Sequence, residues 1–60
     1  MTTHYDIKYQ RNDGSDVWVS LVEDIAKLKE AVDLLKDLRI DAKYKYQIFR
    51  VDIEIKELEY

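Results

Sequence analysis

The pattern of apolar and polar positions predicts two short β-strands near the start of the chain. Side chains alternate between apolar and polar over residues 5–9 and again over residues 17–21, and a period of two is typical of a strand with one buried face. Between these segments, residues 12–14 read Asn-Asp-Gly, which is a strong turn sequence. We therefore expect a β-hairpin.

The register of this hairpin can be predicted from the faces of its two strands. A three-residue loop, with Gly14 in the left-handed region that glycine tolerates, places Tyr9 opposite Val17 and Ile7 opposite Val19. These apolar side chains then share one face. A two-residue loop would shift the pairing by one residue, so that Tyr9 would face Trp18 and Ile7 would face Ser20. The apolar side chains of the two strands would then lie on opposite faces. The longer loop is therefore predicted.

A helix is expected after the hairpin. The segment Ser20-Leu21-Val22-Glu23 has the form of a capping box, in which the serine and glutamate side chains each bond to the backbone amide of the other residue. Apolar residues then recur every three or four positions, as in an amphipathic helix, and we place its end near Leu38. With two hairpin residues they form the predicted core: Ile7, Val19, Ile25, Leu28, Val32 and Leu35.

Residues 43–55 are rich in β-forming side chains and predict a third strand. The apolar side chains change phase near Phe49 and Arg50, from even to odd positions. Either a β-bulge inserts one residue there, or the strand is straight and apolar on both faces. In both cases the strand is longer than the hairpin strands, which would leave backbone groups around residues 51–55 without partners in a monomer.

These elements predict an α+β fold of the ββαβ type in a single domain, residues 1–60. The simplest arrangement is a three-stranded antiparallel sheet in the order 2-1-3, with the helix on one face. The other face of the sheet has no second layer in so short a chain.

Composition limits both the stability and the location of the protein. The chain has 60 residues and no cysteine, so disulfides are excluded, and a domain of this size buries only roughly 60% of the surface of its unfolded form. Together with the uncovered sheet face and the long final strand, this predicts a homodimer.

The start of the chain does not have the form of a signal peptide, and no apolar run approaches a membrane span. We therefore expect a cytoplasmic protein with no membrane partner.

Few residues offer catalytic or metal-binding chemistry. His4 and Asp6 share one strand face, and such a pair can orient an imidazole or bind a metal. We interpret them as solvated strand residues, because the sequence shows neither a nucleophile nor a third ligand beside them. Residues 12–16 resemble part of a calcium loop but lack its spacing and its closing glutamate. We predict no enzyme activity, no cofactor and no metal.

Trp18 is the most informative candidate for binding. Its two sequence neighbours are predicted to point at the helix, so Trp18 is expected on the opposite face, with Lys8 and some of Tyr44, Tyr46 and Ile48. Exposed aromatic residues are enriched in interface hot spots. Two alternatives remain. In the first, Trp18 folds into a second small core. In the second, bases of single-stranded nucleic acid stack on this face, but the net charge of −3 argues against nucleic acid.

The C-terminal part of the chain is acidic. Asp52 and Glu54 are predicted on one strand face, and Glu57 follows them. A charged edge protects a strand from unwanted pairing. Alternatively, these carboxylates form an acidic strip that competes for a basic site on another protein. Ile53, on the long final strand, is a candidate contact in a dimer.

The order of elements resembles that of many short proteins encoded by phages and prophages of Gram-positive bacteria. The resemblance rests on residues 5–9, Asp13-Gly14-Ser15, Trp18-Val19, a helix rich in Glu and Lys, and residues 46–51. Some small acidic phage proteins, anti-CRISPR proteins among them, inhibit host nucleases by occupying a nucleic-acid or partner site. The resemblance thus implies an inhibitor in the cytoplasm of a bacterial host. It assigns no functional residues, and ten basic residues beside thirteen acidic ones depart from the composition of a DNA mimic.

Three functional hypotheses follow from the sequence. The leading one is a small protein-binding module, a phage or mobile-element inhibitor that occupies a site on a host or defence protein. The alternatives are a structural or regulatory homodimer without catalytic activity, and a single-stranded nucleic-acid-binding domain. The predicted partner-binding residues are Trp18, Tyr44, Tyr46, Asp52, Ile53, Glu54 and Glu57.

Overall fold

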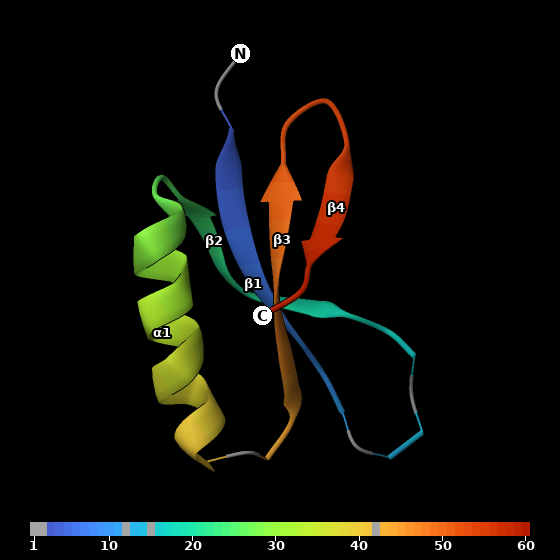
Figure 1. The fold of residues 1–60 in the computed structure, drawn as a ribbon. Helices are drawn as coiled ribbons and strands as arrows, with labels where there is room; N and C mark the ends of the chain where they lie inside the picture. The colour runs from blue at the N-terminus through green and yellow to red at the C-terminus, as the bar shows by residue number, and fades with distance from the viewer. Residues whose placement is uncertain (1–2, 12, 15, 42) are drawn as a thin grey trace.

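The protein has four strands and one helix, which is one strand more than predicted. The computed structural model describes residues 3–11, 13–14, 16–41 and 43–60. In chain order the elements are β1 (His4–Gln10), β2 (Val19–Ile25), α1 (Leu28–Asp41), β3 (Lys45–Val51) and β4 (Ile55–Leu58). The strands form one antiparallel sheet in the order β2-β1-β3-β4, and α1 lies along one face of it (Figure 1). The α+β class and the order of the first three strands are confirmed, whereas the three-stranded sheet is wrong.

The additional strand arises from a turn within the segment predicted as one strand, residues 43–55. The chain reverses after β3, so that Val51 pairs with Ile55 of β4. The Asp52 side chain builds the turn, because its Oδ1 accepts the N–H of Glu54 at 2.9 Å, and the Asp52 N–H donates to the Glu54 carbonyl at 3.0 Å. The expectation of unpaired backbone groups in this segment is therefore wrong, since the segment closes a hairpin.

The change of apolar phase in β3 does not come from a bulge. β3 pairs with β1 residue by residue over its whole length. Neighbouring side chains on a strand point to opposite faces, so Ile48 faces α1 and Phe49 faces the other side, and both are buried. The straight strand that is apolar on both faces is thus the correct alternative.

β2 contains the residues of the predicted capping box, so the prediction that a helix starts there is wrong. Leu21 and Val22 are apolar and suit a strand, and the pairing of this segment with β1 outweighs the local capping pattern. The strand is also irregular. Two extra residues are inserted in β2, one between the partners of Lys8 and Ile7 and one between the partners of Ile7 and Tyr5. Asp24 lies at the second insertion with φ of 60°, a left-handed conformation in which Asp is tolerated better than most residues.

The first turn has the predicted glycine but not the predicted length. Gly14 adopts φ of 91°, the left-handed region that was expected of it. β1 ends at Gln10 and β2 begins at Val19, so the connection between them is longer than the predicted three-residue loop. Asn12 and Ser15, which belong to the predicted turn and to the phage-protein resemblance, lie outside the described residues.

The predicted hairpin register is wrong because of this longer connection. Tyr9 pairs with Val19, two residues beyond the expected partner, and Ile7 pairs with Val22, three residues beyond it. Val19 stays on the predicted face but is exposed, because α1 packs mainly over β3 and β1. Its place in the predicted core is therefore wrong.

The core lies between α1 and the centre of the sheet. Its buried apolar residues are Ile7, Ala31, Leu35 and Ile48. The other expected core residues, Ile25, Leu28 and Val32, are partly buried and pack against it. The helix begins at Leu28, and its first turn is closed by the Ala31 N–H, which donates to the Lys27 carbonyl at 3.2 Å. Ile25 matches the helical spacing but reaches the core from the end of β2.

Candidate functional site

The sheet face opposite α1, here called the open face, carries most of the polar side chains of the sheet. Because Ile7 and Ile48 point to α1, their neighbours along each strand point away from it. By this alternation and the strand registers, the open face comprises His4, Asp6, Lys8 and Gln10 of β1, Lys45, Gln47, Phe49 and Val51 of β3, and Ile55 and Glu57 of β4. Two regions of this face have distinct chemistry, one at each end of β1.

Trp18 packs on the open face, as predicted, but it is half-buried there. Its ring meets the Phe49 ring edge-on, with centroids 5.4 Å apart and an interplanar angle of 68°. The Lys8 Nζ lies 4.9 Å from the centroid of the same Phe49 ring, within the range of a cation–π contact. This is the second small core that we considered as an alternative. Phe49 is therefore buried beneath Trp18 and Lys8.

The tyrosines predicted to join Trp18 lie on the other side of β3. Tyr46 packs against the main core, and Tyr44 contacts the rings of Tyr9 and Tyr46, with centroids 5.0 Å and 6.2 Å apart. The expectation that Tyr46 and Ile48 share a face with Trp18 is therefore wrong, since β3 alternates without a bulge.

These aromatic residues nevertheless meet at one end of the sheet, in a cleft of about 410 Å³. The cleft wraps around the edge of β3 and is lined by Gln10, Trp18, Arg39, Tyr44, Lys45, Tyr46, Gln47 and Glu57. Four of the seven predicted binding residues thus line a single cleft.

The cleft exists because β4 is shorter than β3. The last residue of β4, Leu58, pairs with Ile48, so among the described residues no strand pairs with residues 45–47 on this side of β3. Arg39, in the last turn of α1, reaches this edge and donates from Nη2 to the Tyr46 carbonyl at 3.0 Å. The Gln47 Oε1 is buried and has no hydrogen-bond partner among the described residues. At this edge, the Tyr46 carbonyl is thus occupied by Arg39, and the Gln47 Oε1 is a buried acceptor beside it.

The remaining predicted binding residues lie at the opposite end of β3, in the turn before β4. Asp52 is occupied with the structure of that turn, and its Oδ2 lies 3.6 Å from the Arg50 Nε. Glu54 and Ile53 are exposed in the turn. The prediction that Asp52 and Glu54 share a strand face is wrong, because neither belongs to a strand, and Glu57 is separated from them in the cleft.

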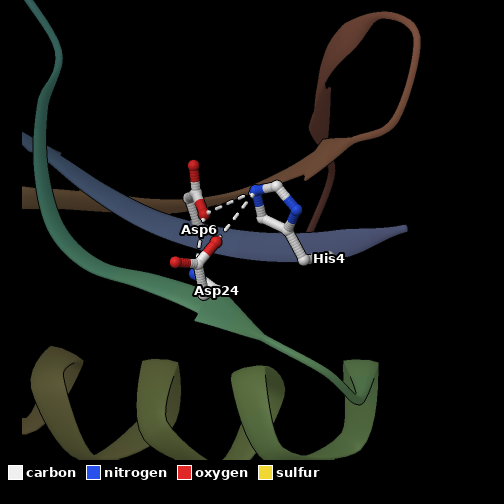
Figure 2. A network of polar contacts seen from close by, with 3 residues as sticks. All are labelled: His4, Asp6 and Asp24. Carbon is white, nitrogen blue, oxygen red and sulfur yellow. Dashed lines mark hydrogen bonds and ion pairs between the residues drawn. The ribbon is translucent and has the colours of Figure 1, made fainter. Parts of the chain in front are cut away.

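The second polar region of the open face is a cluster of His4, Asp6 and Asp24, drawn in Figure 2. The His4 Nε2 lies 3.5 Å from the Asp6 Oδ1 and 3.5 Å from the Asp24 Oδ1. The Asp24 N–H donates to the Asp6 Oδ1 at 3.1 Å. In Figure 2, β1 supplies two of the side chains and β2 the third, and α1 lies on the far side of the sheet.

The local structure of β2 explains why Asp24 joins this cluster. The inserted residue and the left-handed backbone at Asp24 turn its N–H toward the neighbouring strand, and the buried Asp6 carboxylate satisfies that N–H. The sequence revealed two potential ligands but not the third, because Asp24 is 18 residues away from Asp6 along the chain. Only the strand pairing with its bulge brings them together. A His nitrogen and two carboxylates are suitable ligands for a divalent cation.

Comparison with protein-family models, curated proteins and solved structures finds no match for this chain. In the part of the chain that the structure describes, no helix is both long and apolar enough to span a bilayer.

Proposed function

We propose that this protein is a binding module that captures an extended segment of a partner protein in the cleft beside β3. One observation carries the proposal: strand pairing with β4 ends at Ile48, and residues 45–47 of β3, which have no partner strand on that side, border a cleft lined by aromatic and basic side chains. An exposed strand edge can pair with an added strand, which gains affinity from main-chain hydrogen bonds and specificity from adjacent side-chain pockets.

The side chains of the cleft suit such a segment. Trp18, Tyr44 and Arg39 are of the residue types that dominate interface hot spots. Arg39 and Lys45 outnumber the single carboxylate of Glu57, so charge complementarity favours an acidic partner segment. A strand that donates to the Tyr46 carbonyl would release the Arg39 guanidinium, which can then form a paired hydrogen bond with a carboxylate of the partner.

A role as an inhibitor of a host or defence protein, acting in the bacterial cytoplasm, is a narrower form of this proposal. It is supported by the resemblance to small phage proteins and by the small size of the domain. In this form, the protein acts by occupying a site rather than by catalysing a reaction.

Selection of displayed random peptides on the purified protein tests the binding mode. We expect enrichment of extended acidic peptides whose addition shifts the backbone amide resonances of residues 45–47. Arg39→Glu should weaken the binding of a selected peptide by at least about tenfold, which corresponds to 1.4 kcal/mol. Lys36→Glu, the same charge reversal on an exposed helix position, is the matched control and should change affinity little. Equal effects of the two substitutions, or shifts confined to other strands, would contradict the proposal.

Self-association through β4 is a second candidate, favoured by a separate observation. β4 is an outer strand of the sheet, and its first residue, Ile55, and Ile53 in the turn before it are exposed. Two β4 strands paired about a twofold axis would join two sheets into one and cover these side chains. Sedimentation equilibrium over a wide concentration range should show a dimer that Ile55→Lys dissociates and Arg39→Glu leaves intact. A monomer throughout would exclude the dimer without affecting the proposal for the cleft.

A further inference from the structure

We propose that His4, Asp6 and Asp24 form a binding site for a divalent first-row transition metal ion of the Zn²⁺ type. The site lies on the open face, at the end of β1 away from the cleft, and does not depend on the proposed peptide binding. It joins two adjacent residues of one strand face to the bulge of the neighbouring strand.

The distances in the cluster fit a shared ion better than a shared proton. The single Nε2 of His4 lies at the same distance, 3.5 Å, from an oxygen of each carboxylate. One N–H can point at only one acceptor, and a charge-assisted hydrogen bond is normally about 2.7–2.9 Å long. In contrast, bonds of about 2.1 Å in a tetrahedral Zn²⁺ site separate neighbouring ligand atoms by about 3.4 Å. The ligand atoms of all three residues lie within 4.8 Å of one another.

The types of ligand indicate which ions the site would select. Mg²⁺ and Ca²⁺ are bound through oxygen, whereas an imidazole nitrogen favours Zn²⁺ and its neighbours in the first transition row. A neutral imidazole and two carboxylates balance the charge of a divalent ion. The site would also be open, because the Asp24 side chain is 82% exposed, so water can complete the coordination.

The ligands are partly prearranged for an ion. The Asp6 side chain is only 12% exposed, and its Oδ1 already accepts the Asp24 N–H at 3.1 Å. This hydrogen bond holds the two carboxylates next to each other, as supporting contacts do in established metal sites. An ion bound here would link β1 to β2 at the bulge and should therefore stabilise the folded state.

Titration with Zn²⁺ tests the site directly. His4 is the only histidine of the chain, so its imidazole ¹⁵N resonances report on metal binding without overlap. We expect Zn²⁺ to shift the Nε2 resonance and to raise the melting temperature, and an excess of Mg²⁺ to compete poorly. Thermal unfolding with and without Zn²⁺ provides a second measurement that does not depend on the imidazole.

Asp24→Asn is the decisive variant, because Asn retains the size of Asp and its tolerance of the left-handed backbone but removes the anionic ligand. It should weaken Zn²⁺ binding at least about tenfold, by comparison with the effect of removing supporting groups in known sites. Asp33→Asn, on an exposed position of α1, is the matched control and should bind like the parent. Equal affinity of Asp24→Asn and the parent, or an unchanged Nε2 resonance on addition of Zn²⁺, would overturn the proposal.

Discussion

Replacing Ile48 by Val is the sharpest test of the core, because it removes a single methylene group from a fully buried position. Ile48 lies on β3 with 0% of its surface exposed and packs with Ile7, Ala31 and Leu35. Ile55→Val removes the same group from β4, where the residue is 63% exposed in the single chain, and the comparison is made at a concentration where sedimentation shows a monomer. Both residues have β-branched side chains before and after the change, so their strand propensities stay similar. The difference in stability between the two variants therefore reports on the burial of Ile48.

The expected loss of stability can be worked out from burial and size. Ile→Val at a buried site destabilises a protein by about 0.5–1.5 kcal/mol. A 60-residue chain is stable by only about 3–9 kcal/mol, so the change removes a measurable share and still leaves a folded protein. At about 4–8 °C per kcal/mol for a domain of this size, the melting temperature should fall by about 2–12 °C. Ile55→Val should stay within about 0.5 kcal/mol of the parent.

Thermal and urea unfolding, followed by circular dichroism, measures both variants against the parent. The urea midpoint should fall for Ile48→Val with an unchanged slope, because the surface exposed on unfolding hardly changes. If the two variants lose the same stability, or if Ile55→Val loses more, then α1 does not cover β3 as described. The position of the core between α1 and the sheet centre would then be refuted.

Three further predictions concern the backbone and the open face. Gly14→Ala should destabilise the protein by about 1 kcal/mol in urea unfolding, because a side chain is strained at φ of 91°, even with no atom within 4 Å of the added Cβ. An unchanged urea midpoint would show that the turn relaxes. Asp24→Gly should raise stability by up to about 1 kcal/mol, because its φ of 60° suits glycine, and a loss would show that the Asp24 side chain contributes more than its backbone strain costs. Trp18→Ala should cost about 1–3 kcal/mol and expose Phe49, whereas Trp18→Phe should retain most of the stability; equal losses would indicate that the ring contact contributes nothing.

The parts of the fold that were predictable from sequence are those with strong local signals. The alternation in residues 5–9 identified β1, and Gly14 marked the turn with its left-handed conformation. The helical spacing from Leu28 to Leu35 identified the face of α1 that packs on the sheet. Each of these signals depends on residues close together in the chain.

The failures occurred where pairing between distant strands decided the structure. Ser20 and Glu23 have the spacing of a capping box, but pairing with β1 placed them in a strand. The turn at Asp52 has no Gly or Pro, and it depends on a side-chain hydrogen bond of Asp52 that many other aspartates do not make.

The candidate sites show the same limit. Trp18, Tyr44, Tyr46 and Glu57 were selected for their chemistry, and the structure brings all four to one cleft. Trp18 was expected to share one sheet face with some of the tyrosines, whereas Glu57 was expected apart from them, in the acidic strip. Arg39 and Gln47 were not selected, since an arginine near a helix end and a glutamine in a strand carry no signal of their own. Asp24 was missed because its neighbours His4 and Asp6 are remote from it in the chain.

The two edges of the sheet differ in a way that limits how large any assembly can grow. β2 forms one edge, and its two inserted residues and the turned backbone of Asp24 disturb the even spacing of the outward peptide groups. β4 forms the other edge and pairs with β3 in an unbroken register. A bulged edge is a poor template for a further strand. Copies that join through β4 would therefore present only β2 at both outer ends, and growth would stop at two chains instead of continuing into a fibril.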